Sequence, residues 1–505
     1  MKRIQLQKAI LATVFLFLLG SCKKDFITIQ PKELFLASDY YKTRDQALTG
    51  LVAVYDVLRK NSGGFENMIT MMNAGSDDNY AGGGGESDGA GIQSFSNYTI
   101  NANTIPRSFW KDHYQGIFRA NVLLQKLPDI QMDAGEKARF TAETKVLRAI
   151  YYFNLVRMFK NIPLLLEPLV PDQIYTVTQA APSAIYAQIE KDLTEAIPSL
   201  PSTVSPADAG RLNKGAGQAM LGKVYLYENK KTEAAAVLAQ VNGTTPGQPN
   251  QYGNSLLPNF ADLWVHANRF NVEGILECSH TDKSFASWEF WGSSKDEGNT
   301  ASQMVGPRSY KKNTANAPDI YTAGWSFNTW TQDFYDFIKG DPRFNATVLD
   351  MNALKASGDA DYTAGYMNTG YFLRKFIPMR SDIRTGSGSM ELNFKQNSYI
   401  IRLADTYLME AEALGGTGAR AQALLDAVRA RVGLSSVPVS MDAIKRERRL
   451  ELAGEGHRFF DLVRWGDAAS KLASRGFKAG KNEIFPIPAQ ELQGTKLVQN
   501  PGYTF

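Results

Sequence analysis

The sequence predicts a mainly α-helical protein in which tetratricopeptide-like helix pairs form a scaffold and a loop-rich, partly β variable region is added to it. Three observations lead to this prediction. Helical hydrophobic periodicity recurs towards both ends of the chain. One segment has the residue spacing of a tetratricopeptide repeat. The stretch between the helical parts is rich in glycine, asparagine, serine, threonine and aromatic residues instead.

The first 22 residues indicate export and lipid attachment. Lys2, Arg3 and Lys8 precede an apolar run at 10–19 that is too short to span a bilayer, which is typical of a signal peptide. Cys22 directly follows Leu-Gly-Ser, and this arrangement resembles a bacterial lipobox, in which the cysteine is lipidated and becomes the mature N-terminus. The alternative is a plain signal peptide with an incidental cysteine.

The composition fits a folded protein with a large core. The chain has 505 residues, of which 44% are hydrophobic and 21% charged, and these values exclude a disordered, collagen-like or multi-span membrane chain. The formal net charge is +4, and removal of the basic residues Lys2, Arg3 and Lys8 lowers it to +1. Such a chain has no general attraction for nucleic acid.

Two segments have the periodicity of amphipathic helices. Apolar residues at spacings of three and four predict a helix over 136–159, ended by Pro163, and another over 183–197, ended by Pro198 and Pro201. The residues that form these apolar faces are Ala142, Val146, Ala149, Phe153 and Val156 in the first helix, and Ile185, Ile189, Leu193 and Ala196 in the second.

The segment 218–241 follows the tetratricopeptide pattern. Leu221-Gly222 and Tyr225 are followed by Ala234 and Leu238, with leucine in the place of the usual phenylalanine. Small residues let the paired helices approach closely, and one repeat cannot bury its own apolar face, so further pairs must stack beside it. A diverged candidate contains Leu403, Ala404, Tyr407, Ala411, Leu424, Leu425 and Val428.

Residues 242–398 read as loops and short strands on this scaffold. Loops held by a rigid scaffold are where binding residues concentrate. Cys278 alternates with apolar neighbours, so we expect a buried strand residue and not a nucleophile. The aromatic spacing around Trp264 and Trp330 predicts core positions. If Cys22 carries lipid, Cys278 has no partner within the chain, and stability comes from packing instead of a disulfide.

A second loop, 73–96, contains Asp77-Asp78-Asn79-Tyr80 and four glycines at 82–85. The glycine run lacks the Gly-Lys-Ser/Thr ending of a phosphate-binding loop, so a flexible surface loop is expected.

Signatures of enzymes are missing from the sequence. It has no Gly-x-Ser-x-Gly elbow, Walker loop, dinucleotide fingerprint or His-Glu-x-x-His zinc motif, and its four histidines are far apart. Neighbouring carboxylates such as Asp77 and Asp78 do not establish the separated pair that a glycosidase needs. We therefore predict no catalytic residue, no metal site and no cofactor.

The segment 447–465 interleaves charged and large apolar residues so closely that some charges must be buried as pairs. An active site made of Glu455, His457 and Asp461 is one interpretation. A lattice of arginines and carboxylates that clamps the C-terminal segment onto the scaffold is the other, and we favour it because the planar arginine fork suits internal pairing and no nucleophile is present.

Several motifs in order resemble the SusD/RagB family, the nutrient-binding outer-membrane lipoproteins of starch-utilisation-type systems. The C-terminal ones are Arg402-Leu403-Ala404-Asp405, Glu410-Ala411-Glu412-Ala413, Val428-Arg429-Ala430-Arg431, 447–465, Phe485-Pro486-Ile487-Pro488 and Gln499-Asn500-Pro501-Gly502-Tyr503. The earlier ones are Trp110, Asn121, Glu143, Leu147-Arg148-Ala149, Tyr152-Phe153, Pro163-Leu164 and Gly340-Asp341-Pro342-Arg343. Asp426 departs from the family, which often has asparagine there.

The resemblance implies four tetratricopeptide-like helix pairs, a lipidated cysteine, no catalysis, and a position as a lid on a SusC-like TonB-dependent transporter. It divides the chain into a lipoprotein signal peptide (1–21), an N-terminal SusD-like region (22–241), a variable ligand-binding region (242–398) and a C-terminal RagB/SusD region (399–505). The expected location is the outer membrane, lipid-anchored and facing the exterior.

A sugar ring has an apolar face and a polar rim, so aromatic side chains that stack and polar side chains that bind hydroxyls are the groups expected at a glycan site. The candidates from the variable region are Trp288, Trp291, Tyr321 and Trp325, and those from the early loop are Asp77, Asn79 and Tyr80. Import of peptides or another nutrient by the same scaffold is an alternative function. A glycoside hydrolase is a third and weaker one.

Overall fold

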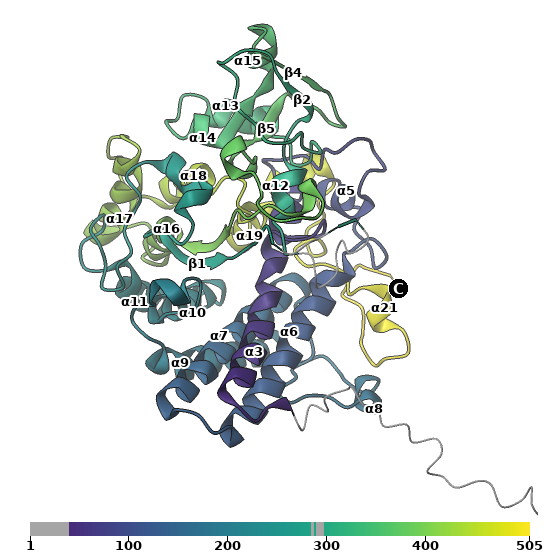
Figure 1. Ribbon diagram of the computed structural model, residues 1–505, viewed down its shortest axis with the longest axis vertical. Helices are drawn as coiled ribbons and strands as arrows, with labels where there is room; N and C mark the ends of the chain where they lie inside the picture. The colour runs from purple at the N-terminus through teal and green to yellow at the C-terminus, as the bar shows by residue number, and fades with distance from the viewer. Residues whose placement is uncertain (1–39, 284–286, 289–296, 505) are drawn as a thin grey trace, which may run out of the picture.

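The computed structural model describes residues 40–283, 287–288 and 297–504 (Figure 1). The predicted signal peptide, Cys22 and Trp291 lie outside this part of the chain. Among the described residues, no helix is both long enough and apolar enough to cross a membrane.

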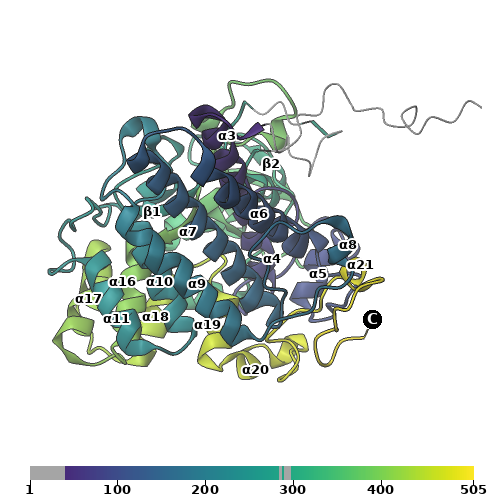
Figure 2. The same ribbon diagram turned by 90° about the horizontal axis from the view of Figure 1, so that it is seen from below.

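The scaffold is a row of antiparallel helix pairs. Each pair packs internally and against the next, so that the row runs from α3 to α17 (Figures 1 and 2). The described pairs are α3 (Arg44–Tyr55) with α6 (Arg107–Lys126), α7 (Ala134–Phe159) with α9 (Pro182–Ala196), α10 (Lys214–Tyr227) with α11 (Lys231–Asn242), and α16 (Leu403–Ala413) with α17 (Gly418–Arg431). The predicted helices over 136–159 and 183–197 are thus confirmed as α7 and α9.

The tetratricopeptide seam between α10 and α11 forms as the spacing predicted. Ala234 and Leu238 are buried against α10. A Cβ atom on Gly222 would lie 2.5 Å from Leu238 Cγ, so only glycine permits this approach of the two helices. The diverged pair is also confirmed, because Tyr407, Ala411, Leu424 and Val428 share one buried cluster between α16 and α17.

The variable region contains short elements, as expected. Its described strands form three two-stranded antiparallel sheets: β1 (Gly274–Cys278) with β6 (Ser398–Arg402), β2 (Arg308–Lys312) with β4 (Ala360–Thr363), and β3 (Val348–Asp350) with β5 (Tyr371–Leu373). The short helices there are α12 (Thr300–Met304), α13 (Gln332–Ile338), α14 (Phe344–Thr347) and α15 (Met351–Ala356). Cys278 is a buried residue of β1, and Trp330 is fully buried, so both predictions are confirmed.

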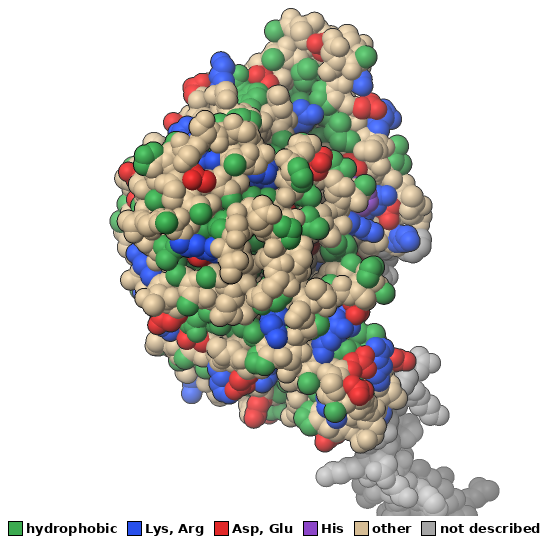
Figure 3. All heavy atoms as spheres, turned by 90° about the vertical axis from the view of Figure 1, so that its left-hand side faces the viewer, with side chains coloured by type: hydrophobic (Ala, Val, Ile, Leu, Met, Phe, Trp, Pro, Cys, Tyr) green, Lys and Arg blue, Asp and Glu red, His purple; other side chains and the backbone are tan. Residues whose placement is uncertain are grey.

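The remaining helices close the molecule around this region. They are α4 (Met68–Ala74), α5 (Ala90–Ser96), α8 (Pro171–Ile174), α18 (Met441–Glu451), α19 (Arg458–Trp465), α20 (Ala468–Lys471) and α21 (Ala489–Leu492). One large apolar core extends from Ala47 on α3 to Leu492 on α21, so the scaffold and the variable region share their packing. On the face that includes α11 and α17, basic and acidic side chains are interspersed, and no large patch of one charge is visible (Figure 3).

Candidate functional site

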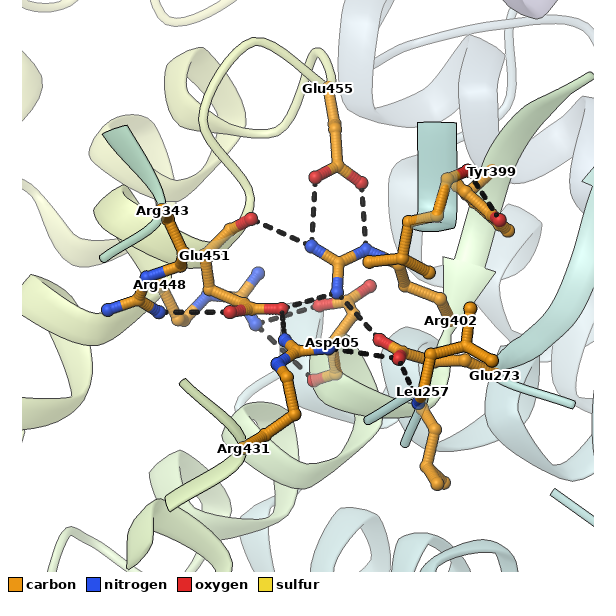
Figure 4. A network of polar contacts seen from close by, with 12 residues as sticks. Leu257, Glu273, Arg343, Tyr399, Arg402, Asp405, Arg431, Arg448, Glu451 and Glu455 are labelled. Carbon is orange, nitrogen blue, oxygen red and sulfur yellow. Dashed lines mark hydrogen bonds and ion pairs between the residues drawn. The ribbon is translucent and has the colours of Figure 1, made fainter. Parts of the chain in front are cut away.

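The segment 447–465 forms a buried lattice of arginines and carboxylates, as the sequence favoured. Arg402 lies at its centre and is 1% exposed (Figure 4). Its Nη1 donates to Glu273 Oε1 at 2.9 Å and to Glu451 Oε1 at 2.6 Å, and its Nε donates to Glu455 Oε2 at 3.0 Å. Glu273 directly precedes β1, Glu451 ends α18 and Glu455 lies in the turn that follows, so one side chain of β6 joins two segments that are far apart in the sequence.

The lattice keeps Glu451 and Glu455 ionised. Burial by itself would raise the pKa of Glu451, but the guanidinium groups of Arg431, Arg402 and Arg343 hold it well below its usual value. The same balance lowers the pKa of Glu455 beside Arg402.

The three residues of the alternative active site belong to this lattice or lie beside it. Both carboxylate oxygens of Glu455 accept hydrogen bonds from Arg402, and Asp461 accepts from Arg448 and Arg464. Burial and the charge of Lys223 lower the pKa of His457 to about 3, which leaves a neutral imidazole. In the described part of the chain, no three or more histidine, cysteine, aspartate or glutamate side chains gather as a metal would require.

In contrast to this charged lattice, three aromatic side chains form an aromatic surface, in which Trp288 is exposed and Phe65 and Trp325 are half-buried. We use this name for Phe65, Trp288 and Trp325. The Trp288 side chain is 52% exposed, and its ring centre lies 6.0 Å from that of Trp325 at an interplanar angle of 32°. Phe65 continues the row, with its ring centre 6.4 Å from that of Trp325. Rings tilted in this way form a curved apolar surface that fits the faces of successive sugar rings.

A polar pair lies next to the aromatic surface. Arg308 Nη2 donates to Asp88 Oδ2 at 2.9 Å, and both side chains are about one-third exposed. The position of the pair is fixed from both sides. The backbone N–H of Arg308 donates to Ser326 Oγ, next to Trp325, and Gly89, the neighbour of Asp88, packs on the Phe65 ring. A hydrogen-bond donor and an acceptor for the hydroxyl groups of a sugar thus lie beside the aromatic rings.

The glycine run explains how this surface is held. Gly82 has a φ of +71°, and a Cβ atom there would lie 2.2 Å from the carbonyl oxygen of Ser326. Gly83 N donates to that same oxygen at 2.9 Å, and Asn328 N donates to Ala81 O. The prediction of a flexible surface loop is wrong for Gly82 and Gly83, because both are buried against the loop that carries Trp325.

The backbone beneath Trp325 is strained. Ser326 and Asn328 adopt left-handed φ values of +62° and +53°, which cost energy for residues other than glycine. The Asn328 side chain is buried and donates to Thr70 O, while the backbone carbonyl of Asn328 accepts from Asn79 Nδ2. These contacts fix a conformation that the loop by itself disfavours.

The predicted early-loop residues lie in structural contacts. Asp77 accepts two hydrogen bonds of 2.8 Å from Arg458, Asn79 is 1% exposed, and the Tyr80 ring lies under the Arg475 guanidinium. Asp77 and Tyr80 thus attach the early loop to the C-terminal part of the chain, and the Asn79 side chain attaches it to Asn328 of the variable region. Tyr321 is half-buried and contacts Phe394 edge to face.

Phe65, Asp88 and Arg308 were not among the residues predicted from the sequence. The only local signal was the position of Asp88 just after the glycine run. Phe65 and Arg308 are separated by more than 240 residues, so only the folded chain brings them together.

Comparison with known proteins agrees with these features. Residues 290–476 match the SusD family, and residues 54–226 match a family described as starch-binding associating with outer membrane. The two matches include most of the scaffold helices and the loop that carries Trp325, while α11 and Trp288 lie between them.

Solved structures share the whole fold. A laminarin binding SusD-like protein is 62% identical, with a TM-score of 0.90 over 92% of this chain and 100% of its own. Surface glycan-binding protein A from Bacteroides thetaiotaomicron is 25% identical, with a TM-score of 0.80 over the same shares of the two chains. SusD-like protein P25 of Formosa agariphila is 26% identical over 95% of this chain and 96% of its own. The chain belongs to the SusD family.

Proposed function

We propose that this protein binds a glycan of the laminarin type on its aromatic surface. The tilted ring pair of exposed Trp288 and half-buried Trp325 carries the proposal. A relative that is 62% identical and is named for laminarin binding supports the proposal, and its name is the reason for choosing laminarin as the glycan type.

The surface has the groups that a sugar chain requires. The C–H faces of successive sugar rings stack on Trp288, Trp325 and Phe65, which buries apolar surface of both partners. Arg308 and Asp88 hydrogen-bond hydroxyl groups at the edge of the same ligand. Trp291 and Tyr321 stay predicted ligand contacts. A few such contacts give a Kd near 1 mM, or about −4 kcal/mol, so the glycan is also released readily.

The proposal includes binding without catalysis at the outer membrane. Cys22 carries the lipid, and a SusC-like TonB-dependent transporter receives the ligand. The lipid anchor is supported by the basic start of the sequence, the short apolar run and the cysteine that follows it. The location is supported by the family description, which names association with the outer membrane. The names of the relatives as binding proteins support a non-enzymatic role. Labelled palmitate is expected to be incorporated into the full chain and lost in Cys22→Ala.

Affinity gel electrophoresis with laminarin tests the binding site. The full chain should be retarded, and a Trp288→Ala, Trp325→Ala double variant should run as in a gel without glycan. Tyr175→Ala is the matched control, because Tyr175 is an aromatic residue that is 60% exposed and lies outside the aromatic surface. Equal retardation of the double variant and the control would contradict the site. Binding of peptides with no response to laminarin, or release of reducing sugar, would contradict the function.

A further inference from the structure

An open apolar groove lies along α6, away from the aromatic surface. Its walls are α6, the connection 163–177 that contains α8, and the C-terminal segment 490–497, and its volume is about 510 Å³. Trp110, Tyr114 and Phe118 line it from α6 at spacings of four, which places the three rings on one side of the helix.

Exposed apolar residues concentrate around this groove. Of the 13 large hydrophobic residues that are exposed in the described part of the chain, three line the groove and three are the chain neighbours of lining residues. They are Phe118, Leu166, Val170, Ile174, Tyr175 and Val498. Single exposed apolar residues are ordinary on a protein surface, but a contiguous group of this kind marks a binding surface.

The walls of the groove are fixed by hydrogen bonds. From α6, Tyr114 Oη donates to Pro163 O and Asn121 Nδ2 donates to Leu165 O, both at 2.9 Å. The backbone of Val498 exchanges two hydrogen bonds with the Gln179 side chain. The groove is therefore formed in advance and needs no rearrangement to accept an occupant.

The described chain begins beside this helix. α3 packs against α6, where Arg119, the neighbour of Phe118, donates to Ala53 O at 2.7 Å (Figure 1). Just before α3, Thr43 pairs with Gln131, which follows the C-terminal end of α6. The chain thus enters the fold beyond the C-terminal end of α6, which is the end of the helix nearer to Phe118 than to Trp110.

The segment that leads to this point has an unusual composition for a linker. Residues 26–36 include Phe26, Ile27, Ile29, Leu34, Phe35 and Leu36. Linkers that stay in water are rich in glycine, serine or charge, whereas an apolar segment between an anchor and a folded domain requires a surface that covers it. Phe35 is five residues before Tyr40, a reach of about 17 Å, and Phe118 to Trp110 spans about 12 Å of helix.

We propose that the groove along α6 binds the chain's own apolar segment 26–36. The segment covers Phe118 and its neighbours, and the lipid attachment point is thereby held close to the α6 face instead of at the end of a free linker. The proposal concerns attachment and orientation, and it is independent of the glycan proposal.

Photo-crosslinking in the full chain tests the location of the segment. With p-benzoylphenylalanine in place of Phe35, we expect crosslinks within one chain to 107–121, 163–177 or 490–498, mapped by mass spectrometry. Val52 is the internal reference, since it is 57% exposed on α3 and lies within the same reach. Equal crosslinking near Val52, crosslinks mainly to a second molecule, or no crosslink would overturn the proposal.

Limited proteolysis provides a second measurement. Trypsin cleavage after Lys32, inside the segment, should be about tenfold faster in Phe118→Asp than in the unchanged chain, because the acid removes the apolar cover. Val52→Asp is the matched control and should change the rate less than twofold. Laminarin retardation should be the same in both variants, which shows that they are folded. Equal cleavage rates in the two variants would overturn the proposal.

Discussion

The charged lattice around Arg402 and the aromatic surface around Trp325 invert the usual distribution of residue types. In the lattice, arginines and glutamates are buried, while at the aromatic surface a tryptophan is more than half exposed. Buried charges tolerate no loss of a partner, whereas exposed rings lose little when nothing covers them. The lattice therefore determines whether the chain folds, and the surface determines what the folded chain binds.

The two regions also differ in how they are held. Each lattice residue is fixed by several partners from distant segments, so the lattice is rigid by its own bonds. Trp325 is positioned by the loop beneath it, through Gly82 and the left-handed residues Ser326 and Asn328. Substitutions in the two regions should consequently separate stability from binding.

The largest expected effect is the loss of Arg402. Arg402→Met keeps the volume but leaves Glu273, Glu451 and Glu455 without their shared partner, and the free energy of unfolding should fall by about 3–5 kcal/mol. Urea unfolding measures it. The control is Arg380→Met, whose exposed pair with Asp319 should change stability by less than about 1 kcal/mol. Similar values for the two variants would contradict the role of the lattice.

Acid should lower the free energy of unfolding and leave glycan binding at the aromatic surface unchanged. Burial lowers the pKa of His113 and of His280 to about 4, below the usual value of 6.5. As pH falls from 7 to 5, each of these histidines binds a proton in the unfolded chain but stays neutral in the folded chain. The free energy of unfolding should therefore fall by about 2 kcal/mol for each histidine.

Urea unfolding at pH 7, 6 and 5 measures this loss, and most of it should appear below pH 6.5. The stacking rings do not titrate, so the laminarin Kd of the folded protein should change less than twofold over this range. A stability that stays constant from pH 7 to 5 would show that these histidines are not neutral and buried.

A smaller effect is expected at the aromatic surface. Trp288→Ala should weaken laminarin binding about tenfold, or about 1.4 kcal/mol, while the free energy of unfolding changes by less than about 0.5 kcal/mol. Calorimetric titration and urea unfolding measure the two quantities. Trp288→Phe keeps a ring and should retain most of the affinity. A large loss of stability in Trp288→Ala would show that the ring is part of the core.

The smallest effect concerns the polar pair. Asp88→Asn keeps the shape and the acceptor for Gly84 N–H but removes the charge that orients Arg308, and laminarin should bind about twofold to fivefold more weakly. Asp361→Asn is the control, because it breaks an exposed pair with Lys355 instead. Equal affinities for the two variants would show that the pair does not contact the glycan.

Much of the scaffold was predictable because helix pairs produce a regular spacing of apolar and small residues over a short stretch of sequence. The periodicity of 136–159 and the spacing from Gly222 to Leu238 were sufficient to predict α7 and the seam of α10 with α11. The interleaved charges of 447–465 likewise predicted buried pairs, since so many charges on a short apolar segment cannot all reach water.

The candidate site was only partly predictable. Trp288 and Trp325 stood out as aromatic residues in a loop-rich region, and the structure places their rings together. The polar residues at 77–80 suggested ligand contacts for the same reason, but Asp77 and Asn79 are engaged with Arg458 and Asn328. A single sequence does not distinguish a polar residue that faces a ligand from one that faces the scaffold.

By itself the sequence determined the class of fold, the helix pairs and the need to bury charges, because these follow from contacts between residues close in the chain. Tertiary structure alone decided which charges pair with Arg402, and which residues surround Trp325. Those contacts join segments up to hundreds of residues apart, and their geometry depends on how the helices and loops pack in space.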